Sequence, residues 1–252
     1  MFRMGFMVLV GLTASMCIAD DAKEGRCFEL RIYTAAPGKY EALHQRFREH
    51  TCKLFVKHGM TNVGYFVPID TNDHRLVYIL AYPNPKARVK SWSGFMRDPE
   101  WLAAWKESEK DGKLVTKIES TILHATDYSN VVTPKVGEPH RTFELRTYTA
   151  SPGNLDRLNA RFRDHTLALF SKHGMEHVGY WIPDGKGSDN TLIYLLAHKS
   201  TADRDASFKA FGEDPDWKAA REASEKDAGG SLTAPEGVKS LMLTPTDYSP
   251  MK

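Results

Sequence analysis

Apolar and polar residues alternate along residues 28–34 of the chain, FELRIYT. The apolar positions, which would share one face, are Phe28, Leu30 and Ile32. The charged and aromatic positions, which would share the other face, are Glu29, Arg31 and Tyr33. A period of two is typical of a strand with one buried face, so this segment predicts a strand. The same alternation returns at residues 143–149, FELRTYT.

A helical pattern follows each of these strands. Leu43, Phe47, His50, Leu54 and His58 recur at steps of three and four residues, which places them on one face of a helix. An apolar face of this kind packs against the rest of the fold. We therefore expect His50, and His165 at the equivalent position of the second copy, to point toward the sheet.

The rest of each copy predicts two strands, a helical region and a last strand. The predicted elements of the first copy are strands at 63–67 and 75–82, short helices at about 86–97 and from 98 onward, and a strand at 116–125. Asp98 and Pro99 suit the N-cap and first turn of the second short helix. The order is strand, helix, strand, strand, helix, strand, which is the ferredoxin-like pattern.

This pattern occurs twice. Residues 28–68 align without a gap to residues 143–183, and 25 of the 41 positions are identical. Such self-similarity indicates a duplicated structural unit. We predict an α+β fold of two tandem ferredoxin-like (βαββαβ) units at 28–130 and 143–249, joined by a linker at 131–142.

One ferredoxin-like unit has helices on one face of its sheet, and its other face needs a cover. The two units are therefore expected to pack sheet to sheet as an internal pseudo-dimeric α+β barrel. In this arrangement we expect the charged strand faces to look into the space between the sheets and the apolar faces to look toward the helices. The charged faces carry Glu29, Arg31 and Tyr33 in the first copy and Glu144, Arg146 and Tyr148 in the second.

Several spaced motifs resemble those of the NIPSNAP family. The first copy carries FELRIYT, PGK, RFREH, KHGM, VGYFVP and DPEW, and the second carries FELRTYT, PGN, RFRDH, KHGM, VGYWIP and DPDW. The resemblance covers about residues 28–129 and 143–249. It implies the dimeric α+β barrel fold and no particular reaction. The family is usually discussed with mitochondria and vesicle traffic, but this chain begins with a secretory-type leader, so that role is not carried over.

The first 19 residues have the composition of a signal peptide. Arg3 precedes the apolar segment 5–19, and two aspartates follow it. We expect cleavage after Ala19 and a secreted or periplasmic protein, the alternative being an uncleaved N-terminal anchor. The formal charge of +2, from 34 basic and 32 acidic residues, does not indicate nucleic acid as a partner, nor a membrane after cleavage. The internal pseudo-dimer leaves room for further homo-oligomerisation.

Familiar catalytic motifs such as GxSxG, GxxxxGK[ST] and HExxH are missing from the sequence. Cys27 and Cys52 lack counterparts in the second copy, so a CxxC-type metal site is excluded. The sequence identifies no cofactor. Whether the two cysteines pair depends on a geometry that the sequence does not specify.

The candidate ligand-binding residues are shared by both copies. They are Arg31, Tyr33, His50, Tyr65, Arg146, Tyr148, His165 and Tyr180. Arginine can hold a carboxylate or phosphate through two hydrogen bonds, and histidine can act as a base or as a haem or metal ligand. The two later tyrosines follow glycines, which permit close approach. Structural roles compete with each of these: ion pairing of the arginines, hydrogen bonding of a core histidine, and cross-strand packing of the tyrosines.

Three kinds of function are compatible with these features. The first is binding of a small-molecule ligand in or beside the barrel, which we favour. The second, supported by fold analogy, is a cofactor-free oxygenase or isomerase, or a haem protein with His50 or His165 as ligand. The third is an interaction or scaffold module of the cell envelope.

Overall fold

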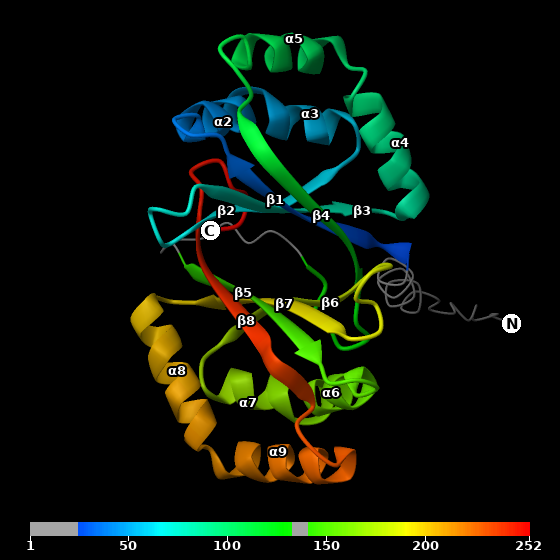
Figure 1. Ribbon diagram of the computed structural model, residues 1–252, viewed down its shortest axis with the longest axis vertical. Helices are drawn as coiled ribbons and strands as arrows, with labels where there is room; N and C mark the ends of the chain where they lie inside the picture. The colour runs from blue at the N-terminus through cyan, green and yellow to red at the C-terminus, as the bar shows by residue number, and fades with distance from the viewer. Residues whose placement is uncertain (1–24, 133–140) are drawn as a thin grey trace, which may run out of the picture.

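The computed structural model describes residues 25–132 and 141–252 and shows the predicted order of elements in both repeats (Figure 1). The first repeat contains β1 (Cys27–Ala35), α2 (Tyr40–Arg46), η1 (Phe47–Thr51), α3 (Cys52–Lys57), β2 (Thr61–Pro68), β3 (Arg75–Tyr82), α4 (Pro85–Phe95), α5 (Pro99–Ser108) and β4 (Val115–Ala125). The second repeat contains β5 (Thr142–Ala150), α6 (Leu155–Arg161), η2 (Phe162–Thr166), α7 (Leu167–Lys172), β6 (Glu176–Pro183), β7 (Thr191–His198), α8 (Thr201–Glu213), α9 (Pro215–Ala228) and β8 (Thr233–Pro245).

Two segments predicted from the sequence lie outside the described residues. These are the signal peptide at 1–19 and most of the linker, residues 133–140. Among the helices that are described, none combines the length and the apolar character needed to cross a membrane. Cys27 and Cys52 are both free.

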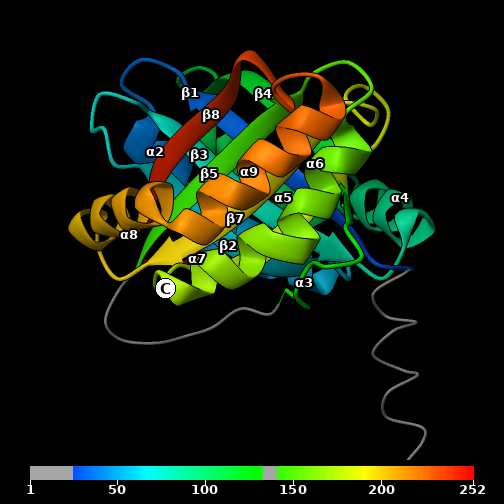
Figure 2. The same cartoon turned by 90° about the horizontal axis from the view of Figure 1, so that it is seen from below.

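The strands form one closed antiparallel barrel in the order β1-β3-β2-β8-β5-β7-β6-β4. Within each repeat the central pairs are long, as in β1 with β3 and β4. The two repeats are joined where β2 pairs with β8 and where β4 pairs with β6. The last strand of each repeat therefore bonds to the other repeat, and closure leaves neither sheet with a free edge. The helices lie on the outside, as Figure 2 shows for the second repeat.

The interior of the barrel is apolar, which corrects the expected orientation of the first strand. Phe28 and Leu30 lie in the core between the two sheets, where Phe28 meets Trp181 edge to face with ring centroids 5.7 Å apart. Glu29, Arg31 and Tyr33, and likewise their counterparts in β5, face the helices instead. The sequence analysis expected the reverse, with the charged face between the sheets and the apolar face toward the helices. A barrel lined by two sheets offers few hydrogen-bond partners, whereas the helices supply the donors that a buried carboxylate needs.

Two glycines next to candidate tyrosines are explained by the barrel core. A Cβ atom on Gly64 would lie 2.5 Å from the ring of Phe66, and one on Gly179 would lie 2.5 Å from the ring of Trp181. Each glycine sits at a bulge in its strand pairing. The glycines therefore make room for an aromatic ring two residues further along the same strand, inside the barrel.

The short segments that follow β4 and β8 form hydrogen bonds and ion pairs with the other repeat. After β4, Asp127 accepts hydrogen bonds from Arg163, and Tyr128 donates to Asn159, 2.6 Å away. After β8, Asp247 accepts in the same way from Arg48. The repeated TDYS motif thus forms a reciprocal pair of clasps between the repeats.

Candidate ligand-binding site

The first long helical segment of each repeat contains a π-helical turn. In η1 the N–H of Cys52 donates to the carbonyl of Phe47, five residues earlier, and η2 has the same geometry. The extra residue rotates the helix, so Thr51 takes the buried position and His50 turns outward with 43% of its side chain exposed. His165 is exposed as well. The expectation that these histidines face the sheet is wrong, because a regular helical period was assumed.

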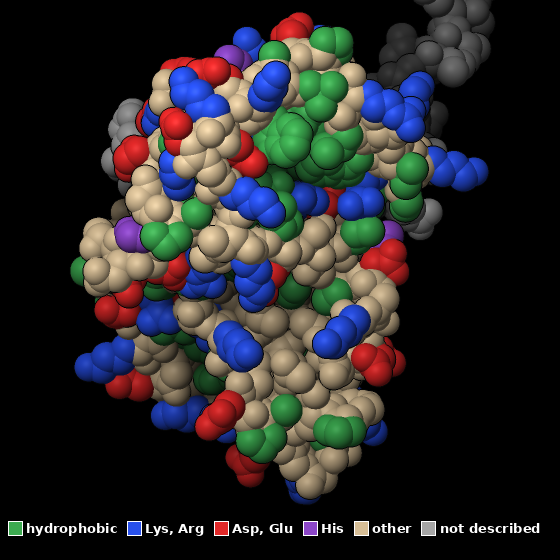
Figure 3. Space-filling view, turned by 45° about the horizontal axis from the view of Figure 1, so that its top comes forward, with side chains coloured by type: hydrophobic (Ala, Val, Ile, Leu, Met, Phe, Trp, Pro, Cys, Tyr) green, Lys and Arg blue, Asp and Glu red, His purple; other side chains and the backbone are tan. Residues whose placement is uncertain are grey.

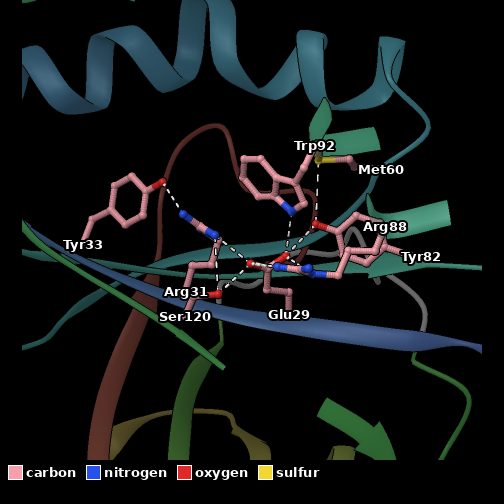
Figure 4. A network of polar contacts seen from close by, with 8 residues as sticks. All are labelled: Glu29, Arg31, Tyr33, Met60, Tyr82, Arg88, Trp92 and Ser120. Atoms are coloured by element: carbon pink, nitrogen blue, oxygen red, sulfur yellow. Dashed lines mark hydrogen bonds and ion pairs between the residues drawn. The ribbon is translucent and has the colours of Figure 1, made fainter. Parts of the chain in front are cut away.

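A buried carboxylate, Glu29, organises the space between β1 and α4 (Figure 4). Arg88 of α4 donates two hydrogen bonds of 2.9 Å to it, and Trp92 donates its indole N–H at 2.8 Å. Further donors to Glu29 are Arg31 at 2.6 Å, Ser120 at 2.7 Å and Tyr82 at 2.9 Å. One side chain thereby holds the helix, the sheet and the guanidinium of Arg31 in a fixed arrangement.

These contacts keep Glu29 ionised. Burial alone would raise its pKa, but the hydrogen bonds from Arg88, Ser120 and Trp92, together with the charge of Arg31, lower the pKa to about 2. In the second repeat, burial likewise opposes ionisation of Glu144. The contact with His198 at 3.4 Å, the hydrogen bonds from Arg204 and Ser240 and the charge of Arg146 lower its pKa. Both repeats therefore contain a buried carboxylate that is ionised at neutral pH.

Beside this network lies a hollow of about 340 Å³ between the sheet and the helices η1, α4 and α5. Seven aromatic side chains contribute to its lining: Tyr33, Phe47, Phe55, Trp92, Phe95, Trp101 and Trp105. Arg31 forms part of the wall, where its guanidinium donates to the hydroxyl of Tyr33 at 3.0 Å and lies 4.5 Å from the ring centroid of Trp92. The hollow combines large aromatic surfaces with a small number of fixed polar groups, as ligand pockets do.

The rim of this hollow is apolar although it faces water. We define the rim by its half-exposed lining residues, which are Met96, Leu102, Trp105 and Ile118. Their exposed fractions lie between 44% and 55%. Figure 3 shows apolar side chains gathered on the part of this face that belongs to the first repeat. A group of exposed large apolar side chains around a cavity marks an interaction site more often than isolated ones do.

A second arginine, Arg46, lines the deeper part of the hollow with 5% of its side chain exposed. Its Nη1 donates to Glu109 at 3.0 Å and to Ser108 at 3.3 Å, and its guanidinium lies 5.3 Å from the ring of Trp101. Its buried Nε has no hydrogen-bond partner among the described residues. Arg46 therefore keeps a donor available for a group inside the hollow.

The second repeat has a smaller hollow, of about 240 Å³, at the equivalent place. Three of its four rim positions have lost their apolar character: Gly212, Lys218 and Arg221 replace Met96, Leu102 and Trp105. Val238 stands where the first repeat has Ile118, as the strand registers show. Arg221 lines this hollow and donates to Glu225 at 3.1 Å. The apolar rim therefore belongs to the first repeat.

The eight candidate residues separate into four groups in the structure. Arg31 and Tyr33 line the hollow of the first repeat, and Tyr148 lines that of the second. Arg146 is buried in hydrogen bonds with Glu144, Tyr148 and Tyr194. Tyr65 and Tyr180 are fully buried in the packing between helices and sheet, where they stack on Tyr78 and Tyr194. His50 and His165 lie outside both hollows.

The residues that sequence reasoning missed are Arg46, Trp92 and the rim. Arg46 belongs to the RFR motif that both copies share, and nothing in that motif distinguishes a pocket-lining arginine from one on the surface. The rim could have been recognised in another way, because its residues differ between two copies that are otherwise similar in sequence. Comparing the copies for divergence, in addition to identity, would have pointed to Trp105.

The closed barrel, with helices outside and a hollow under them in each half, defines the chain as a dimeric α+β barrel made from one polypeptide. A monooxygenase-like protein from Lactobacillus acidophilus NCFM has the same fold, with a TM-score of 0.58 and 12% identity over 88% of this chain and 94% of that protein. An anthrone oxidase-like protein gives a TM-score of 0.59 and 13% identity over 92% and 96% of the two chains. At such identities the likeness shows the fold alone.

The NIPSNAP family model matches residues 28–130 and 143–250, and the chain belongs to the NIPSNAP family. The mouse (Mus musculus) protein NipSnap homolog 3B is 28% identical over 97 residues. That match covers 35% of this chain and 38% of the mouse protein, so it spans well under half of either. The resemblance read from the motifs of both copies is confirmed.

Proposed function

We propose that the hollow of the first repeat binds a small, largely apolar molecule, and that the second repeat acts as its structural support. The observation that carries this proposal is the apolar rim around an aromatic-lined hollow in one repeat and not in the other. Keeping large apolar side chains in water has a free-energy cost, which a bound molecule would remove. A cavity of about 340 Å³ lies at the lower end of the range in which ligands are bound.

The polar groups of the hollow favour binding over acid–base catalysis. The residues that line it include no histidine, and their one carboxylate, Glu109, is paired with Arg46. A general base must be positioned against the proton that it abstracts, and the Oε1 atom of Glu109 is instead held by Arg46 and by the backbone N–H of Leu114. The monooxygenase-like and anthrone oxidase-like neighbours leave oxygenation as the competing activity, which oxygen uptake with the bound compound would reveal.

The experiment is a titration with the neutral fluorescent probe N-phenyl-1-naphthylamine. The unaltered protein should enhance the fluorescence of the probe, with one probe molecule bound per protein chain. Trp105→Arg, which installs the residue of the second repeat, should weaken binding about tenfold or more, because it replaces apolar rim area by a charge. Arg221→Ala in the second repeat is the matched control and should leave binding unchanged. Equal binding by Trp105→Arg and the unaltered protein would exclude this site.

We propose in addition that binding takes place outside the cytoplasm. The support for this is the signal-like sequence of residues 1–19, with Arg3 before the apolar segment and Asp20 after it. Protein isolated from its source cells should then begin at Asp20 when its intact mass is measured. A mass that includes Met1 would contradict cleavage.

A further inference from the structure

We infer that the molecule bound in the first repeat is an aromatic carboxylic acid, whose acid group meets Arg46 and whose rings lie among the tryptophans of the hollow. This inference rests on the proposed binding function and names its ligand class. It draws on the charge balance of the hollow, on the hydrogen-bond capacity of Arg46, and on the shape of the walls.

The charge balance around the hollow is positive. Arg31, Arg46 and Lys113 line it, and Glu109 is the carboxylate among its lining residues. The nearby Glu29 does not reverse this balance, because it is shared by Arg31 and Arg88. Cationic groups therefore outnumber carboxylates, and their field is strengthened because the side chains of Arg31 and Arg46 are only 13% and 5% exposed. A site of this sign favours an anion.

The hydrogen-bond capacity of Arg46 shows where an acid group would lie. Glu109 and Ser108 both use the Nη1 atom of this guanidinium, and its buried Nε has no hydrogen-bond partner among the described residues. A guanidinium presents its donors in a planar fork that matches a carboxylate. Lys113 also lines the hollow, and its amine adds a positive charge without the planar fork of donors that would orient a carboxylate. The second repeat has the equivalent Arg161, which provides an internal control.

The walls favour a flat ring system over an aliphatic chain. Trp92, Trp101 and Trp105 all line the hollow. The indole of Trp92 is fixed by its hydrogen bond to Glu29, and the ring of Trp101 packs on Phe95 with centroids 4.4 Å apart. Rigid aromatic walls gain energy from stacked or edge-to-face contact with another ring. A bicyclic aromatic acid matches both the volume and the lining.

The test compares 1-naphthoate with 1-naphthamide, which has the same shape and no charge, by isothermal titration calorimetry. We expect the acid to bind roughly tenfold tighter, as one charge-assisted hydrogen bond predicts, and its affinity to fall with added salt. Decalin-1-carboxylate, the saturated analogue, should bind more weakly than naphthoate. Arg46→Met should abolish the preference for the acid over the amide, while Arg161→Met in the second repeat should preserve it.

Each outcome decides between the two proposals. Equal affinities of acid and amide for the unaltered protein would overturn the inference and leave the binding function intact, and so would binding of the neutral naphthylamine probe alone. If neither that probe nor either naphthyl compound binds, the proposed function itself fails. Should Arg46→Met not fold, the acid–amide comparison on the unaltered protein still gives the answer.

Discussion

Replacing the buried carboxylate of the first repeat by its neutral isostere should destabilise the protein in a pH-dependent way. In Glu29→Gln the side chain keeps its shape but loses its charge, and its amide N–H₂ would face donors from Arg88 and Trp92. Arg31 and Arg88 would then both lose the carboxylate with which they form ion pairs. Breaking a buried ion pair from one side costs about 3–5 kcal/mol in unfolding free energy.

The pKa of Glu29 gives an independent estimate of the same quantity. Burial opposes ionisation, yet the hydrogen bonds from Arg88, Ser120 and Trp92 and the charge of Arg31 lower the pKa from 4.5 to about 2. This displacement corresponds to about 3 kcal/mol of stability. Because the folded-state pKa is the lower one, this contribution is fully present above pH 4.5. It is lost as the pH falls from about 4.5 to about 2.

The assay is urea unfolding of the unaltered protein and of Glu29→Gln at a series of pH values from 7 down to 3. We expect a difference of about 3 kcal/mol at pH 7 that narrows steadily below pH 4.5. Glu144→Gln in the second repeat should behave in the same direction, since the pKa of Glu144 is also lowered. A difference that stays constant with pH, or the absence of a difference at pH 7, would refute the assignment of Glu29 as an ionised hub.

Three further predictions concern packing, the clasps and the outward histidine. Gly64→Ala should cost about 1–3 kcal/mol, because its Cβ would meet the ring of Phe66 at 2.5 Å, and thermal unfolding would measure the loss. Tyr248→Phe removes the 2.7 Å hydrogen bond with His44 and should cost about 0.5–1.5 kcal/mol in urea unfolding, with no loss of secondary structure by circular dichroism. His50→Ala should change stability by less than about 0.5 kcal/mol and leave probe binding unaltered, because the side chain is exposed and outside the hollow.

The fold could be predicted from the sequence because strong local patterns agreed in two copies. The strand at 28–34, its counterpart at 143–149 and the caps of the later helices depend on short-range chemistry, and each appears as expected. Sheet-to-sheet packing followed from the need to cover a second face. The barrel's closure through β2 with β8 and β4 with β6 is a long-range pairing that no local pattern specifies.

The candidate site was only partly predictable, for two physical reasons. Alternation along a strand divides residues into two faces but does not say which face is outside, and the Glu29 face was placed on the wrong side. A π-helical turn adds one residue without leaving a recognisable pattern, so His50 was placed on the buried face that Thr51 occupies. Arg31 and Tyr33 were expected between the two sheets, and the structure places them in the lining of the hollow on the helix side.

The contrast between the repeats shows which parts of the unit are constrained. Both repeats have the buried carboxylate with its arginines and serine, which joins helix to sheet, and the π-helical turn. Both also have the clasp, which joins one repeat to the other. The rim residues contribute nothing to closure and face water, so they could change in one copy without loss of the fold. The second repeat has glycine, lysine and arginine at these positions, the pattern expected of an ordinary solvated surface. The first repeat has a methionine, a leucine and a tryptophan half-exposed to water there, and a bound molecule is the physical reason that best accounts for their position.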